Sequence, residues 1–250
     1  MKDLFKWLKR ILLILFGIGF SLCLFLAGYL AISGYQMYED AIQEKSLSQR
    51  VEEVRSKPGY TAYDQLPELY REAVVAVEDH RFFQHWGIDP IAILRALWHD
   101  LQAGAYVEGG STITQQLAKN LCFTQEKLLT RKVAEVFAAF ALEREYSKEE
   151  ILELYVNSIY FGNGYYSVRE ASIGYFQKEP SRMTPSECTM LAGIPNAPSA
   201  YALTASPELA RERQIQVLRQ MVDTGAITQE QADDILAEPQ DQKAGLKTAS

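Results

Sequence analysis

The sequence predicts a mainly helical, all-α protein in which one transmembrane helix precedes a folded domain. Residues 11–33 form a stretch of 23 residues without a charge. Helix-capping patterns recur through the rest of the chain, and no alternating strand pattern with hairpin turns competes with them. With 250 residues, 48% of them hydrophobic and 23% charged, the chain is long enough for one core or two small lobes.

The uncharged stretch is long enough to cross a bilayer. At about 1.5 Å per residue, such a helix spans a hydrocarbon core of roughly 30 Å. A cleaved signal peptide is the alternative, but its apolar region usually has about 7 to 15 residues, and no convincing small-x-small cleavage site follows here. We therefore predict a retained anchor.

Charges on either side of this stretch predict its orientation. Basic residues precede it and acidic residues follow it, so the positive-inside rule places the N-terminus in the cytoplasm and the domain outside. After the first ten residues, which hold four basic residues and one acidic residue, the net charge is −10. A nucleic-acid partner needs a broad basic face and is therefore not expected.

The same patterns divide the chain. We predict a cytoplasmic tail at 1–10, a transmembrane helix at 11–33, a polar stalk leading into the domain at 34–63, the folded domain at 64–238 and a polar tail at 239–250. Cys122 and Cys188 are the cysteines outside the span, and we expect both to be free and buried, although an exported chain leaves one disulfide open. No set of His and Cys has zinc spacing.

Each helix of the domain has its own start signal. Pro67 opens a segment with apolar residues at helical spacing. Asp89 and Pro90 are an N-cap and a first-turn proline for a helix whose apolar face reaches about Leu101. Three capping boxes begin later helices: Ser147 with Glu150, Thr184 with Glu187, and Thr228 with Gln231.

Glu78 ends the first of these helices and precedes the run DHRFFQHWG. The negative end of the helix dipole and the nearby rings both disfavour the charged carboxylate. We therefore expect a raised pKa, in the range where a carboxylate acts as a general base. The alternative is a solvated acid at a helix end, which is the common state of a glutamate.

Residues 109–120, GGSTITQQLAKN, lead from a glycine pair into another helix, with Ser111 or Thr112 as its N-cap. At about 100° per residue, one side is polar and carries Thr112, Gln115, Gln116 and Lys119. Unpaired N–H groups at the helix start, together with Lys119, would suit a diphosphate. The alternative is a polar face that only meets water, although such faces favour Glu, Lys and Arg.

Glu135 lies in the next helix, with Arg131 at i−4 and Lys132 at i−3. These cations should keep its carboxylate ionised, in contrast to Glu78. Two carboxylates with opposite shifts suggest divided roles in a reaction at an anomeric carbon. The alternative is an exposed, salt-bridged helix face.

Four ordered segments within residues 68–234 carry a resemblance to a known family. The first is residues 78–87, the second is GGSTITQQLAKN without a gap, and the third is the set Arg131, Lys132 and Glu135. The fourth runs from Lys148 through Asn157 to Gly162. Together they resemble the signatures of family 51 glycosyltransferases, the polymerases of bacterial peptidoglycan.

This resemblance implies a lysozyme-like glycosyltransferase domain with head and jaw lobes, held at the bacterial inner membrane. Glu78 would deprotonate the 4-hydroxyl of an acceptor sugar on lipid II. The oxygen would attack C1 of the growing strand, invert it from α to β, and expel polyprenyl diphosphate. Glu135 would steady the acceptor side or the developing positive charge. The implied substrate-binding residues are Ser111, Thr112, Gln115, Gln116, Lys119, Lys127, Arg131 and Lys132.

Two positions depart from the family pattern. Lys127 stands where many relatives have arginine, which keeps the charge and loses a bidentate fork. Gln177 stands where glycine is usual, and this departure affects the expected local turn and not the chemistry. Four apolar residues flank the expected cleft and are either interfacial or simply core: Trp98, Tyr106, Val107 and Phe123.

The resemblance also indicates which partners and alternative functions to expect. Lipid II, the growing strand and the membrane are implied partners, and proteins of cell wall synthesis or division would be further ones. No cofactor is implied, and a divalent cation such as Mg²⁺ is neither required nor ruled out. No Ser-x-x-Lys occurs in the sequence, so we expect no transpeptidase activity. A lytic transglycosylase or glycosidase and a non-catalytic scaffold are the alternatives.

Overall fold

The computed structural model describes residues 2–104, 109–123 and 129–238. These residues form helices and no strand, apart from one isolated bridge between Trp86 and Ile88, so the all-α prediction is confirmed. The α-helices are α1 (Lys2–Glu44), α2 (Leu47–Arg55), α3 (Glu68–Glu78), α4 (Pro90–Ala103), α5 (Ile113–Cys122), α6 (Leu129–Glu145), α7 (Lys148–Val156), α8 (Val168–Phe176), α9 (Pro185–Gly193), α10 (Pro198–Tyr201), α11 (Pro207–Asp223) and α12 (Gln229–Ala237).

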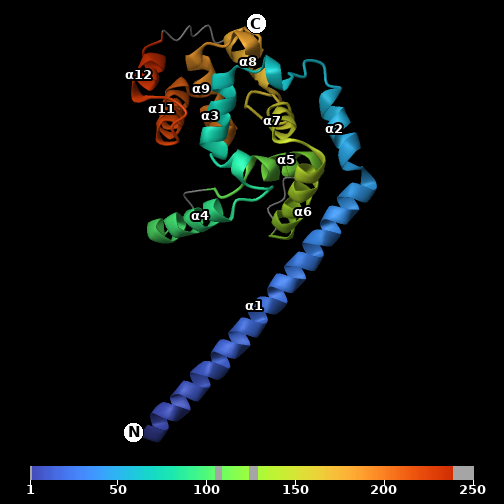
Figure 1. The fold of residues 1–250 in the computed structure, drawn as a ribbon, viewed down its shortest axis with the longest axis vertical. Coiled ribbons are helices and arrows are strands. Elements are labelled where there is room, and N and C mark those ends of the chain that lie inside the picture. The colour runs from blue at the N-terminus through green and yellow to red at the C-terminus, as the bar shows by residue number, and fades with distance from the viewer. Residues whose placement is uncertain (1, 105–108, 124–128, 239–250) are drawn as a thin grey trace.

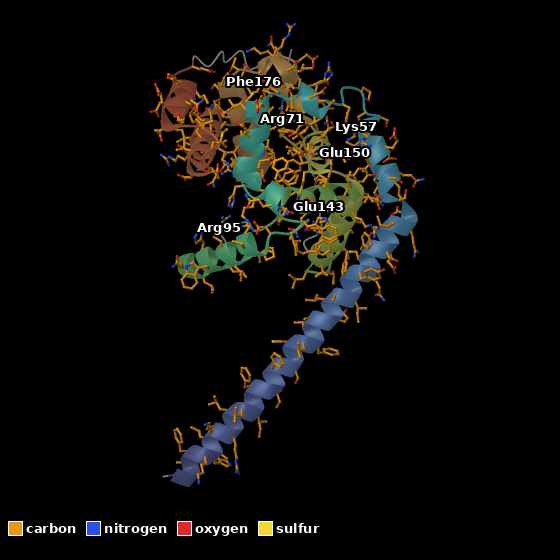
Figure 2. The ribbon with its side chains drawn as sticks, in the orientation of Figure 1. Lys57, Arg71, Arg95, Glu143, Glu150 and Phe176 are labelled. Carbon is orange, nitrogen blue, oxygen red and sulfur yellow. The ribbon has the colours of Figure 1, made fainter. Side chains whose placement is uncertain are left out.

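Helix α1 extends far from the rest of the chain (Figure 1). It is the one helix among the described residues that is long and apolar enough to cross a membrane, and its apolar part is not buried by protein. Its side chains project into open space along most of its length (Figure 2). The predicted span at 11–33 lies within it, and together with the charges at its ends it indicates a membrane-anchored protein.

Residues 34–63 differ from the expected stalk. Helix α1 continues without a break to Glu44 and packs against α6, where a Cβ on Gly34 would lie 2.6 Å from Cβ of Val133. Next to this close approach, the rings of Tyr35 and Phe137 meet edge to face at 5.2 Å. Glycine permits this contact because it has no side chain. The segment is therefore part of the folded body.

Two polar contacts fix the remainder of this segment. The Arg50 guanidinium donates to the backbone carbonyls of Ala41, Lys45 and Leu121, which joins α1, α2 and α5. Buried Asn157, at the end of α7, exchanges hydrogen bonds with the backbone N–H and carbonyl of Thr61. A buried amide satisfied on both sides specifies one arrangement of the chain.

The buried core extends through two groups of helices. Helix α3 packs against α9 and α11, and α5 packs against α6 and α7. The predicted caps are present, including Asp89 with Pro90 and all three later capping boxes. Cys122 and Cys188 are free and buried, as expected.

Helix α4 projects from this body on the side from which α1 leaves (Figure 1). Its predicted apolar face is largely exposed, and Trp98 is 61% and Leu101 77% accessible. The interpretation of Trp98 as a core residue is therefore wrong. Phe123 is partly buried against the core, and Tyr106 and Val107 lie outside the described residues.

Gln177 ends α8 in the left-handed conformation, with φ 57° and ψ 32°. This conformation costs an ordinary residue about 1–2 kcal/mol, and glycine is the usual residue at such a helix end. Glycine, which the family resemblance led us to expect here, would adopt this conformation without that cost. The turn itself forms in this chain.

Candidate active site

Glu78 is the last residue of α3, as predicted. Its Oε2 accepts a hydrogen bond from Nε2 of Gln116 on α5, at 2.8 Å. Its Oε1 is buried and has no hydrogen-bond partner among the residues described here. One carboxylate oxygen is thus held in place while the other remains able to take a proton.

The electrostatic surroundings of Glu78 raise its pKa, as the sequence predicted. Burial is the largest cause, and the charge of Asp79 adds to it. The hydrogen bond from Gln116 and the cations Arg213 and Lys119 act in the opposite direction. The cause is therefore removal from water more than the helix end alone. A buried carboxylate with a raised pKa is suited to accept a proton.

Glu78 borders a cleft of about 730 Å³ between α3, α4, α5 and α11. This volume is typical of sites for small organic ligands. Five predicted site residues line it: Glu78, Ser111, Thr112, Gln116 and Lys119. The base and the cation expected at a diphosphate thus share one cavity.

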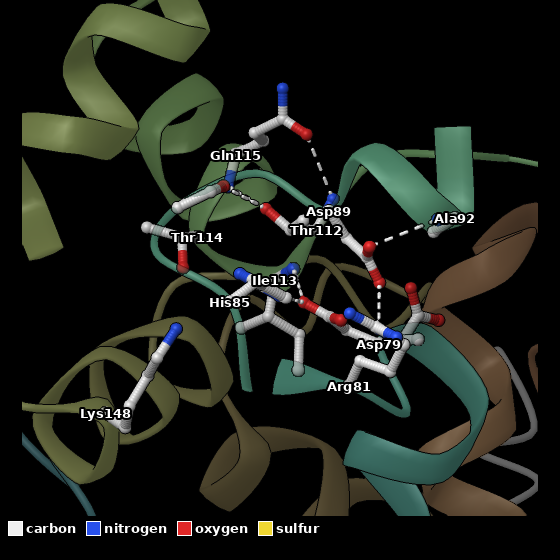
Figure 3. A network of polar contacts seen from close by, with 12 residues as sticks. Asp79, Arg81, His85, Asp89, Ala92, Thr112, Ile113, Thr114, Gln115 and Lys148 are labelled. Carbon is white, nitrogen blue, oxygen red and sulfur yellow. Dashed lines mark hydrogen bonds and ion pairs between the residues drawn. The ribbon is translucent and has the colours of Figure 1, made fainter. Parts of the chain in front are cut away.

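Several N–H groups at the start of α5, which the sequence analysis expected to be unpaired, are bonded within the protein (Figure 3). The N–H of Ile113 donates to Oδ2 of Asp79 at 3.1 Å, and the N–H of Gln115 donates to Oγ1 of Thr112 at 3.1 Å. The Gln115 side chain returns a bond to the Thr112 N–H. These groups cap the helix, so the side chains of Gln115 and Thr112 make hydrogen bonds within the protein in this structure.

Asp79 ties this helix start to the loop after α3. Its Oδ2 also accepts from Nε2 of His85 at 2.8 Å, and both side chains are only 3% exposed. The Thr112 hydroxyl donates to the carbonyl of Gly87 at 2.7 Å. Further along the loop, Arg81 pairs with the N-cap carboxylate of α4, Asp89, at 3.0 Å (Figure 3). The network holds α3, α4 and α5 around the cleft.

Glu135 is 1% exposed, so the interpretation of an exposed helix face is wrong. Its Oε1 lies 2.9 Å from Nη1 of Arg131, and its Oε2 accepts from Nζ of Lys132 at 2.8 Å. Lys132 also donates to the hydroxyl of Ser111 at 2.6 Å. This cluster therefore reaches the cleft at Ser111.

Lys119 carries a positive charge into the cleft at a cost. Burial lowers the pKa of its ammonium group, and Arg131 and Lys132 lower it further, while Glu135 opposes them. An anion bound beside these three cations would relieve their repulsion. Lys127, the fourth predicted cation, lies outside the described residues.

The fourth signature supplies a support for the site. The ammonium of Lys148 pairs with Glu143 at 2.7 Å and lies over the ring of Phe82. Glu143 also accepts from the hydroxyl of Thr114 at 2.6 Å. These partly buried contacts join α5, α6 and α7.

Sequence reasoning missed some residues that the fold brings to the cleft. Arg213 on α11 lines it and lowers the pKa of Glu78. Arg95 rises from α4 toward the body (Figure 2) and contacts Nε2 of His80 at 3.4 Å. No capping pattern or helical periodicity distinguishes these arginines, because their positions depend on packing between distant helices.

Comparison with known proteins agrees with this geometry. The family model described as transglycosylase matches residues 43–222. Penicillin-binding protein 1F of Bacillus subtilis is 48% identical over 68% of this chain and 24% of that protein. Penicillin-binding protein 1A of Neisseria lactamica is 39% identical over 92% and 31%. The chain thus spans about a quarter to a third of the length of these relatives.

A solved structure, penicillin-binding protein 1A from Haemophilus influenzae, matches 72% of this chain and 17% of that chain, with a TM-score of 0.44 and 24% identity. The family match extends over most of the chain and includes α3, α5, α6 and α7, which carry Glu78 and its surroundings. The chain therefore belongs to the transglycosylase family, glycosyltransferase family 51.

Proposed function

We propose that this chain polymerises lipid II into β-1,4-linked glycan strands of peptidoglycan at the outer face of the bacterial inner membrane. One observation carries the proposal. A buried carboxylate with one unpartnered oxygen, Glu78, shares a cleft with the cation Lys119. A proton acceptor beside a site for negative charge is what glycosyl transfer from a diphosphate requires.

The proposed step proceeds with Glu78 as the base. Its Oε1 takes the proton of the 4-hydroxyl of the acceptor sugar on lipid II. The hydroxyl oxygen then forms a bond to C1 of the growing strand, and the bond from C1 to the polyprenyl diphosphate breaks. The diphosphate leaves with the electron pair and the centre inverts from α to β. Lys119, Arg131 and Lys132 supply positive charge on the leaving-group side.

Lys119→Ala should chiefly weaken donor binding. Because a hydrogen bond or contact with a charged partner contributes about 1.5–3 kcal/mol, the apparent KM for lipid II should rise by about 10- to 100-fold. Lys57→Ala is the matched control, because Lys57 is exposed and lies far from α4 and the cleft (Figure 2). Polymerisation of fluorescent lipid II at varied concentration measures this, and an unchanged KM would refute the assignment.

A substrate with a polyprenyl chain also requires a domain close to the bilayer. Helix α4, whose apolar face is largely exposed, lies on the side from which α1 leaves the domain (Figure 1). Amphipathic helices of this kind bury their apolar face at the boundary of headgroups and acyl chains. We expect α4 to rest there, with Trp98 at headgroup depth.

Quenching by brominated lipids tests this placement. In a variant with Trp7→Phe and Trp86→Phe, Trp98 is the remaining tryptophan. Its fluorescence in liposomes should be quenched by bromine near the headgroups more than by bromine at the chain ends. Fluorescence unaffected by either lipid would show that α4 stays in water.

The rival function is lytic cleavage of finished strands. It would use a carboxylate on a similar helical scaffold, but a glycan polymer has no diphosphate to match the three cations. Incubating the full chain with lipid II and, separately, with sacculi distinguishes the two. Lengthening of lipid II supports the proposal, whereas digestion of sacculi with lipid II untouched contradicts it.

A further inference from the structure

Three side chains from three helices form a continuous line of hydrogen bonds that ends at the catalytic base. Tyr155 of α7 is completely buried, and its hydroxyl donates to Oε1 of Gln116 at 3.2 Å. Gln116 of α5 donates through Nε2 to Oε2 of Glu78 on α3 at 2.8 Å. Burial raises the pKa of Tyr155 well above its usual value, so this hydroxyl keeps its proton.

The tyrosine decides which end of the amide faces Glu78. An amide has one accepting and one donating end. The buried Tyr155 hydroxyl has no other acceptor for its proton among the described residues, so it donates to the amide oxygen and leaves the NH₂ group directed at the carboxylate. The reversed amide would place two oxygens against each other at the position now occupied by the 2.8 Å bond. That arrangement requires a proton on Oε2 of Glu78, and this proton would occupy the base before the acceptor arrives.

We infer that Tyr155 is a positioning residue for the proposed reaction, acting through Gln116 to keep Oε2 of Glu78 unprotonated and Oε1 free to accept the proton. The inference rests on the proposed function of Glu78 as the base. Tyr155 itself touches no substrate, because it is fully buried behind Gln116. Its effect is therefore on the protonation of the base and on kcat, with little effect on substrate binding.

Tyr155→Phe removes the donating hydroxyl and retains the ring. Without it the Gln116 amide can reverse, and the protonated form of Glu78 becomes more populated. The acid limb of the profile of kcat against pH should move to higher pH by about half a unit to one unit, the equivalent of one net hydrogen bond. The KM for lipid II should stay within about twofold of wild type, because Tyr155 makes no contact with the bound substrate.

Tyr70→Phe is the matched control. Tyr70 is also completely buried, and its hydroxyl has no hydrogen-bond partner within the described part of the chain. Its removal should leave the acid limb in place. A general loss of packing would affect both variants. The proposed role of Tyr155 instead predicts that the acid limb shifts for Tyr155→Phe alone.

The full chain is assayed in detergent micelles with fluorescent lipid II over a pH series, with thermal unfolding measured alongside. In a Gln116→Leu background, Tyr155→Phe should cause no further shift, because the connection to Glu78 is already broken. If Tyr155→Phe does not fold, Gln116→Leu alone must shift the limb. A limb identical to that of Tyr70→Phe, or a shift that persists in the Gln116→Leu background, overturns the inference.

The outcomes separate this inference from the proposed function. An active Glu78→Gln variant would show that Glu78 is not the base, and the proposed role of Tyr155 would then fall as well. If Glu78→Gln is inactive and Tyr155→Phe leaves the acid limb of the pH profile in place, only the proposed role of Tyr155 is refuted.

Discussion

Glu78→Gln is expected to lower kcat for strand synthesis by about 10²- to 10⁴-fold, the usual contribution of a general base. Glutamine has nearly the same shape, and its carbonyl can still accept the bond from Gln116, but it cannot take the acceptor proton. The variant should still bind a diphosphate-bearing lipid through Lys119. Initial rates of lipid II polymerisation by wild type and variant, side by side, measure the effect.

The stability of this variant provides its control. Because burial raises the pKa of Glu78, the folded chain binds this proton more tightly than the unfolded chain does. Ionised Glu78 therefore lowers stability at neutral pH, and stability rises as the pH falls through the raised pKa. The neutral glutamine removes this cost, so the unfolding temperature should not fall. A folded variant that keeps a tenth of the activity would exclude Glu78 as the base.

Among the proposed variants, Asp79→Ala should give the largest loss of folding stability. It leaves two buried donors without a partner, the N–H of Ile113 and the ring of His85. Each of the two unsatisfied groups costs about 1–3 kcal/mol, so the free energy of unfolding should fall by about 2–6 kcal/mol, a large part of a typical total of about 5–15 kcal/mol. Activity should fall as well, because the start of α5 positions Gln116 beside Glu78.

Two variants frame this result. Asp79→Asn retains one accepting oxygen and should lose less stability than Asp79→Ala. Asp64→Ala removes an exposed carboxylate and should change stability by less than about 0.5 kcal/mol. Urea unfolding in detergent, followed by circular dichroism, gives all three values. A loss for Asp79→Ala no greater than that for Asp64→Ala would mean that the network carries no stability.

Local patterns predicted the helices well, because a cap acts within one turn. Asp89 with Pro90 and Ser147 with Glu150 begin helices in the structure as they do in the sequence. The place and raised pKa of Glu78 were also predictable from its position among aromatic residues at a helix end.

Contacts between distant segments were not predictable in the same way. Unpaired N–H groups were expected at the start of α5, but Asp79, 34 positions earlier, accepts a hydrogen bond from the first of them, that of Ile113. Helical periodicity placed Gln115 and Gln116 on one polar side, yet Gln115 caps the helix and Gln116 reaches Glu78. Periodicity reports the direction of a side chain, and the partner it meets depends on the packing of other helices.

The unbroken course of α1 has a geometric consequence. The helix leaves the predicted span at Ser33 and is at once held against α6 at Gly34, with no flexible joint between them. Each residue inserted at this point would turn the domain by about 100° about the helix axis and lift it by about 1.5 Å. The length of one helix therefore sets both the height of the cleft above the lipid and the rotation of the cleft about the helix axis.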